Sequence, residues 1–160
     1  MRTSATGRCE AERAGQAGFT LVEILVALAI VAILAGGVAL TLPDPARTAQ
    51  QATAQALHAQ AASAARHARS EAQPWAWQVD ADGGRLLVAA DGRWQAAGKP
   101  LSSSGLAVGG PEIDGVRRPP GSAIVFAAVP PIFAVDLQGD GRRWRIAGQP
   151  NGRVTLEQLP

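Results

Sequence analysis

The chain has few of the residues that stabilise small exported domains by covalent or aromatic means. Cys9 is the only cysteine in 160 residues, so no intrachain disulfide can form. There is no tyrosine, and the aromatic residues are three phenylalanines and four tryptophans. Lys99 is the only lysine, and the formal net charge is only +2. Disulfide-stapled folds are therefore excluded, and net charge gives no argument for a polyanionic partner.

Against this background, residues 19–42 form one long apolar run that carries a single charge, Glu23. A helix of this length is about 36 Å long, enough to cross the roughly 30 Å of hydrocarbon in a bilayer. One carboxylate inside such a span costs roughly 2.5–3.5 kcal/mol on insertion scales. We therefore predict a transmembrane helix in which Glu23 has a positively charged partner.

Cleavage of the chain between Gly18 and Phe19 would supply that partner. It gives Phe19 a free α-amine, one helical turn from Glu23 on the same helix or on a neighbouring one. A buried charge is tolerated when it is paired and costly when it is alone. We interpret Glu23 as an assembly charge that sets the register between helices. The alternative, an ordinary single-pass anchor, leaves Glu23 unexplained.

The stretch G-F-T-L-V-E followed by about twenty apolar residues resembles the prepilin signal of type IV pilins and type II secretion pseudopilins. The resemblance implies that a prepilin peptidase cuts after Gly18, that Phe19 is N-methylated and that Glu23 is the family's glutamate. The polar leader contains Arg2, Arg8 and Arg13, which favour a cytoplasmic N-terminus. The resemblance also implies a single-pass protein of the bacterial inner membrane, with its C-terminal domain in the periplasm.

The sequence divides into a leader at 1–18, a transmembrane helix at 19–42, a periplasmic helix at 43–73 and a β domain at 74–160. The pattern Pro43-Asp44-Pro45 breaks the first helix and allows Asp44 to cap a second one. From Ala46 to Gln73, twelve alanines and no glycine or proline favour that second helix. Its predicted buried stripe is Ala54, Leu57, Ala61, Ala64, Ala65 and Ala68.

Beyond Pro74, short alternating runs separated by turns predict strands. They are Trp75–Asp80, Arg85–Ala90, Arg93–Ala97, Ala123–Val129, Ile132–Leu137, Arg142–Ala147 and Arg153–Leu159. Residues 98–121 are predicted to be a flexible loop with one short strand at Leu106–Val108. Pro130 and Pro131 favour different sheets for the runs that flank them. The predicted fold is α+β and pilin-like: a long N-terminal transmembrane helix continuing into an Ala-rich helix packed on an antiparallel β domain.

The closing pattern W-R-I…N-G-R-V-T-L, at 144–146 and 151–156, resembles the GspH/FimT group of type IV pilin-like proteins. This group contains the minor pseudopilin H of type II secretion and its pilus relatives. The resemblance implies a structural subunit near the tip of the pseudopilus, with minor pseudopilins I, J and K and major pseudopilin G as partners. The F-x-x-[DN]-G stretch common in the group is not evident, so a minor pilin of a type IV pilus stays as the alternative.

No pattern in the sequence indicates an enzyme, a cofactor or a metal site. His58 and His67 are nine residues apart on the predicted helix and project in different directions. Serines 102–104 are interpreted as part of the loop. The pairs Asp80/Asp82 and Asp136/Asp140 offer oxygen ligands for calcium, but both are explained as hairpin turns.

A nucleic-acid contact is the alternative from another class of function. Arg143 and Arg145 fall on one face of a predicted strand, and Trp144 falls on the other. We expect Trp144 to enter the core and the arginines to be solvated or paired with Asp136 and Asp140. Trp75, Trp77 and Trp94 are predicted to form the core rather than a sugar-binding platform.

Overall fold

The computed structural model describes residues 19–41 and 44–160 of the chain. The predicted leader, including Gly18, lies outside the described residues, as do Leu42 and Pro43. The chain divides into two units, Met1–Leu42 and Pro43–Pro160.

The first unit contains the helix α1, Leu21–Thr41, whose first turn carries Glu23. Its large apolar side chains are solvent-exposed within the single chain, from Phe19 to Leu34. Over residues 19–41 and 44–160, no helix is long and apolar enough to cross a membrane. The transmembrane span at 19–42 stays a prediction.

The second unit begins with α2, Pro45–Ser70, and its N-terminus confirms the predicted cap. The Asp44 carboxylate accepts a hydrogen bond from the Ala46 N–H at 3.0 Å, and Pro45 occupies the first helical turn. The helix ends three residues before the predicted position. Ala72 adopts a left-handed backbone conformation with φ of 52°, which a continuing helix does not allow.

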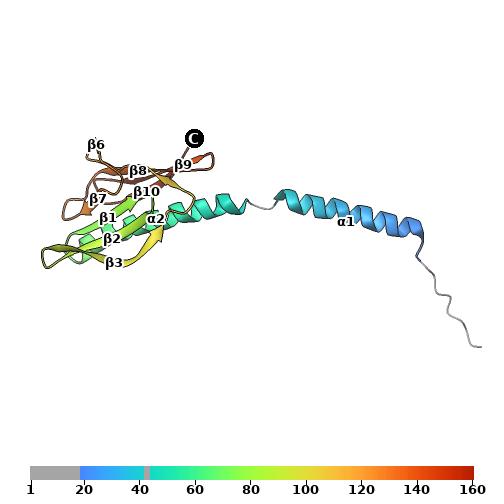
Figure 1. Cartoon of the computed structure of the whole chain (residues 1–160), viewed down its shortest axis with the longest axis horizontal. Coiled ribbons are helices and arrows are strands. Elements are labelled where there is room, and N and C mark those ends of the chain that lie inside the picture. The colour runs from blue at the N-terminus through green and yellow to red at the C-terminus, as the bar shows by residue number, and fades with distance from the viewer. Residues whose placement is uncertain (1–18, 42–43) are drawn as a thin grey trace, which may run out of the picture. The chain divides into compact units, whose positions relative to one another are not determined.

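Ten strands follow α2 and form two antiparallel sheets (Figure 1). The first sheet has the order β3-β2-β1-β7, with β1 at Trp75–Asp80, β2 at Gly83–Ala90, β3 at Arg93–Ser102 and β7 at Ala123–Phe126. The second has the order β10-β9-β8-β5-β6, with β4 paired to β8. Its strands are β4 Ala107–Val108, β5 Glu112–Ile113, β6 Val116–Arg117, β8 Phe133–Gly139, β9 Arg142–Gly148 and β10 Val154–Leu159.

This arrangement confirms the α+β class and most of the predicted strands. The meander β1-β2-β3 forms as expected, and Pro130 and Pro131 separate strands of different sheets. The predicted loop 98–121 is different in the structure. It holds the end of β3 and the three short strands β4 to β6, because β8 pairs with β4 and β5 and so draws this segment into the second sheet.

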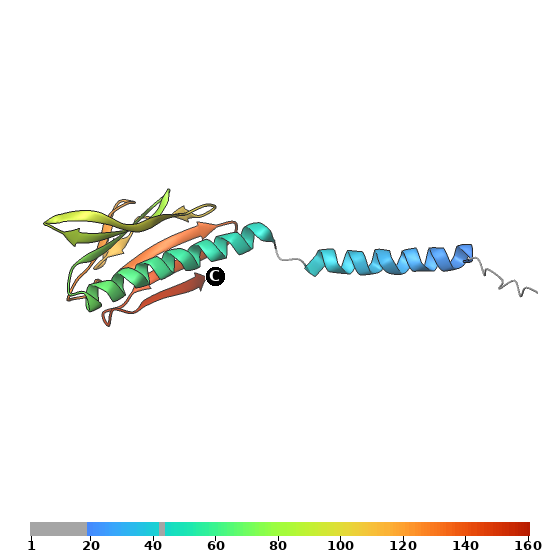
Figure 2. The same ribbon diagram turned by 90° about the horizontal axis from the view of Figure 1, so that it is seen from below.

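The helix α2 contacts strands of both sheets and lies along the domain beside them (Figure 2). All six residues of the predicted stripe are buried, which confirms the expected contact face. The small alanine side chains leave room for the large core residues of the sheets. These are chiefly Trp77, Ile124, Val135, Leu137 and Ile146.

Two buried glutamines fix α2 to the two sheets. Gln60 accepts a hydrogen bond from Trp77 Nε1 at 3.0 Å and donates one to the Gly84 carbonyl at 3.2 Å. Gln50 donates to the Asp140 carboxylate at 3.1 Å and accepts from its main-chain N–H at 3.2 Å. Gln60 thus binds polar groups of the first sheet, and Gln50 binds the turn between β8 and β9 of the second, which specifies the register of α2 on the domain.

Candidate functional site

The start of α1 places the Glu23 carboxylate back over the first residues of the helix. Glu23 Oε2 accepts hydrogen bonds from the Thr20 N–H at 3.0 Å and from the Thr20 hydroxyl at 3.2 Å. The Glu23 N–H in turn donates to Thr20 Oγ1 at 3.2 Å. This reciprocal pattern is a capping box, in which a Thr and a Glu three residues later satisfy each other's N–H groups.

Sequence reasoning missed this contact, although T-x-x-E before an apolar run is its recognised signal. Glu23 therefore has a partner in its own chain, within the described residues. This contact means that an ordinary single-pass anchor can also account for Glu23. The role of Glu23 as a helix cap is compatible with its predicted role as an assembly charge, because Thr20 directly follows Phe19. A carboxylate at this position also meets the partial positive charge of the helix N-terminus. The predicted cleavage point itself, after Gly18, lies outside the described residues.

The second candidate, the arginine-rich strand β9, divides its side chains as predicted. Trp144 is only 3% exposed, whereas Arg143 and Arg145 lie on the solvent-facing side of the sheet. Arg145 binds Asp136 through two hydrogen bonds, Nε to Oδ1 at 2.7 Å and Nη2 to Oδ2 at 3.1 Å. Arg143 donates to the main-chain oxygen of Pro160 at 2.7 Å. Hydrogen bonds from Arg145 lower the pKa of the Asp136 carboxyl below its ordinary value.

Acidic residues balance the arginines across this outward face. Asp136 and Glu157 lie directly opposite Arg145 on the two neighbouring strands. Glu112 lies opposite Arg117 in the same way. Together with Arg143, the face carries three cations and three anions, and direct cross-strand neighbours of opposite charge attract each other. A groove of about 370 Å³ on this face is lined by Arg143, Arg145 and Asp136, and Asp136 neutralises one of the two arginines.

We expect the full chain to give no retardation of a labelled DNA duplex at about 0.15 M salt. Affinity for duplex grows with the number of phosphates that cations neutralise, and Arg145 is already neutralised by Asp136. The measurement is a gel shift with the parent chain and with Arg143→Ala/Arg145→Ala. Retardation by the parent that the double variant loses would contradict this expectation and restore the nucleic-acid hypothesis.

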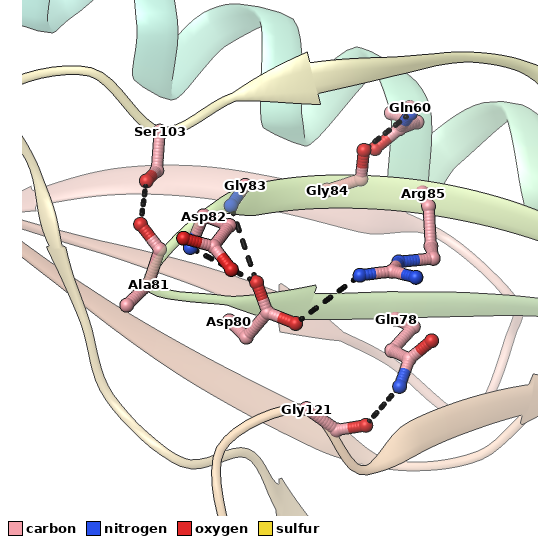
Figure 3. Close-up of polar contacts among 10 residues, drawn as sticks. All are labelled: Gln60, Gln78, Asp80, Ala81, Asp82, Gly83, Gly84, Arg85, Ser103 and Gly121. Carbon is pink, nitrogen blue, oxygen red and sulfur yellow. Dashed lines mark hydrogen bonds and ion pairs between the residues drawn. The ribbon is translucent and has the colours of Figure 1, made fainter.

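The two candidate calcium sites are hairpin turns in the structure. Asp80 Oδ1 accepts the N–H groups of Asp82 and Gly83 at 3.0 and 3.3 Å, and Oδ2 pairs with Arg85 at 3.6 Å (Figure 3). In the other pair, Asp136 is bound by Arg145 and Asp140 by Gln50. Nowhere in the described residues do three or more His, Cys, Asp or Glu side chains gather in a way that could hold a metal.

The two histidines and the buried loop serine Ser103 each have a partner elsewhere in the domain. His58 Nε2 lies 3.1 Å from the Val154 carbonyl. His67 stacks on Trp75 with ring centroids 4.4 Å apart and binds Glu71 at 2.7 Å. Hydrogen bonds lower the pKa of the Glu71 carboxyl, and the bond from Gln73 has a larger effect than the one from His67. Ser103 is buried and donates to the Ala81 carbonyl (Figure 3), so it ties the end of β3 to the β1–β2 turn.

The prediction for the tryptophans is correct for two of the three. Trp75 and Trp77 are buried, but Trp94 is 46% exposed. Trp94 lies on β3, the edge strand of the first sheet, on the side turned away from α2. In the domain formed by residues 44–160, α2 covers the other side of this sheet, so the alternation of the strand directs Trp94 to solvent.

Comparison with known proteins addresses the N-terminal segment and the fold. Residues 13–39 match the family model of the prokaryotic N-terminal methylation motif. No curated protein matches the chain. Among solved structures, the chain is similar to the minor pseudopilin EpsH from the type 2 secretion system of Vibrio cholerae. The TM-score is 0.47 with 17% sequence identity, over 69% of this chain and 95% of EpsH.

The chain therefore carries a prokaryotic N-terminal methylation motif in the segment where the prepilin-type signal is predicted. The roles of Gly18, Phe19 and Glu23 within this segment stay predictions.

Proposed function

We propose that this chain is a minor pseudopilin, a structural subunit near the tip of the periplasmic pseudopilus of a type II secretion system. The observation that carries the proposal is the N-terminal methylation motif at residues 13–39. Within it, a prepilin peptidase cuts between Gly18 and Phe19, and the new N-terminal Phe19 is methylated. The leader at 1–18 is removed, and the chain acts without making or breaking bonds by its own side chains.

Residues 19–42 anchor the mature chain in the bacterial inner membrane, and residues 43–160 lie in the periplasm. The support is in the sequence: residues 24–42 contain no charged side chain, and three arginines precede Gly18. The periplasmic part consists of a helix at 43–73 and the β domain at 74–160. After leader removal the chain contains 12 basic and 11 acidic residues, a net charge close to zero. Assembly therefore depends on local contacts and not on overall charge.

In the filament, the Glu23 carboxylate pairs with the free α-amine of Phe19 on a neighbouring subunit. The contacts of Glu23 support this role, because its carboxylate lies 3.0 Å from the Thr20 N–H, one residue beyond the expected new terminus. A contact between two different surfaces of successive subunits generates an open helical array. The capping box holds the carboxylate at the helix start before and during this pairing.

The partners of the mature chain are the minor pseudopilins I, J and K at the tip and the major pseudopilin G below. The second candidate function is a minor pilin of a type IV pilus, which the same N-terminal motif supports equally. The two candidates share the cleavage site, the methylated terminus and the membrane anchor. They differ only in the set of subunits that the periplasmic domain meets.

Deletion of the gene in its native bacterium separates the two candidates. For a minor pseudopilin we expect loss of exoprotein secretion, restored by the full chain on a plasmid, with surface pili unchanged. Secretion is measured as the fraction of a reporter exoprotein in the medium, and pili by shearing and gel analysis. Loss of pili with normal secretion would establish the minor pilin instead. A deletion that leaves both normal would contradict both functions.

A further inference from the structure

We propose that the outer edge of β3, at residues 93–97, is a docking site for a short extended, acidic segment of another polypeptide chain. The segment adds to the first sheet as a further strand. Its identity as part of another filament subunit rests on the proposed function, whereas the docking edge itself does not. Three features of the strand converge on this site: free main-chain groups, an exposed aromatic side chain and a local excess of positive charge.

The hairpin between β2 and β3 determines which main-chain groups are free. Its two turn residues, Asp91 and Gly92, have φ of 51° and 71°, the signature of a type I′ turn. The closing pair Ala90/Arg93 is therefore hydrogen-bonded, and the next pair Ala89/Trp94 is not.

An independent contact agrees with this assignment. The Ala89 N–H donates to the Pro74 carbonyl at 3.0 Å, on the side away from Trp94. The N–H and C=O of Trp94, and those of Ala96 two residues later, consequently point outward from the sheet edge. Unpaired edge groups of this kind are the template on which an added strand binds.

The second half of β3 is closed to such pairing, which limits the length of the partner. The β2–β3 register shifts between Gly84 and Leu86, and Gly98 adopts φ of 81°. Pro100 has no N–H to offer, and Lys99 beside it is a common device that protects sheet edges. The open edge is therefore the regular stretch Arg93–Ala97, and the partner contributes about five residues.

The side chain of Trp94 gives the open edge an apolar contact. It is 46% exposed on the outward face of the sheet. The register places Ala96, Leu87, Ala76 and Val125 in one cross-strand row beside it, and this row carries no charge. An added strand would place alternate side chains next to Trp94 and Ala96, where apolar residues remove the indole from water.

Charge determines which partner fits the edge. The open edge Arg93–Ala97 contains Arg93 and no acidic residue, and Lys99 follows in the closed half of β3, whereas Asp91 lies in the turn before the strand. Neither cation takes part in an ion pair within the described residues. Two copies of β3 would bring together two strands that carry only positive charge, which disfavours a second copy of this chain. An acidic side chain opposite Arg93 completes a cross-strand ion pair.

The experiment uses the full chain in detergent micelles and two acetylated five-residue probes. In one peptide glutamate and isoleucine alternate, and in the other lysine replaces glutamate. Amide hydrogen exchange at Trp94 and Ala96, followed by NMR, reports pairing at the edge. We expect the acidic peptide to slow both amides and to bind about two- to five-fold more tightly than the lysine peptide, the ratio expected for one cross-strand ion pair. Arg93→Glu should reverse this preference.

The decisive variant is Ala96→Pro, which removes an outward N–H without removing a bond to β2. We expect it to abolish protection by the peptide, whereas the matched Ala96→Val keeps the N–H and retains binding. Equal binding of both peptides, no binding, or binding that survives Ala96→Pro in folded protein would overturn the proposal. Peptide-free self-association that Ala96→Pro abolishes would also overturn it, because the occupant is then a second copy. If Ala96→Pro unfolds the domain, Arg93→Glu still tests the proposal, because this variant should reverse the preference for the acidic peptide over the lysine peptide.

Discussion

A chain in which Gly18 is replaced by valine is expected to keep its 18-residue leader. The proposed cleavage separates Gly18 from Phe19, and a peptidase site that accepts glycine holds the main chain close to its own catalytic groups. A branched side chain at this position displaces the scissile bond, and a displacement of about 1 Å reduces a rate on the order of 100-fold. The retained leader appears on a gel and by mass spectrometry as a chain that begins at Met1.

The matched control for this variant is Gly7→Val, which makes the same change inside the leader. We expect the Gly7 variant to be processed normally and to begin at a methylated Phe19. A Gly18→Val chain that is processed at the parent rate would contradict the proposed cleavage point. Fully active parent protein that still begins at Met1 would contradict the whole prepilin interpretation.

Removal of the charge at Glu23 is expected to abolish incorporation into the filament while processing at Gly18 continues. In the proposed assembly, a neutral residue leaves the α-amine of the neighbouring Phe19 buried without a counter-ion. Loss of one partner of a buried ion pair costs about 3–5 kcal/mol, which is more than 100-fold in an association constant. The measurement is the fraction of the chain that co-purifies with sheared filaments.

The capping box makes the choice of substitution important. Glu23→Gln keeps an oxygen that accepts the Thr20 N–H, so it preserves the cap and removes only the charge. Glu23→Ala removes both. If the charge is what matters, both variants fail to incorporate; if the cap alone matters, Glu23→Gln incorporates normally and the pairing mechanism is wrong. Thr20→Val, which perturbs the cap by about 0.5–2 kcal/mol and leaves the charge, serves as the control.

The local elements of the domain at residues 44–160 were predictable because their signals are local. Asp44 and Pro45 specify the start of α2 through the geometry of one helical turn. The alternation around Trp144 correctly separated the buried indole from the exposed arginines. The alanine stripe was identified because three- and four-residue spacing defines one helix face whatever that face meets.

Other features depend on contacts between residues far apart in the chain, and these the sequence did not reveal. Gln50 and Gln60 look like surface residues in an Ala/Gln-rich helix, but Gln60 binds Trp77 on β1 and Gln50 binds Asp140 in the turn between β8 and β9. The segment 98–121 looks like a loop because the strands β4 to β6 within it are only two residues long and exist through pairing with β8 or each other. Trp94 looks like core because large apolar residues usually are, but no second layer covers its side of the sheet.

By itself, the sequence determined the N-terminal methylation motif, the α+β class and the face of α2 that is buried, since these follow from short-range patterns of charge, apolarity and turn residues. Only the tertiary structure decided that Arg145 is neutralised by Asp136, that Glu23 caps its own helix and that β3 is an open sheet edge with Trp94 beside it. The physical reason is that neutralisation, capping and exposure depend on which groups meet in space, and side-chain identity leaves that undecided until the strands and helices are placed together.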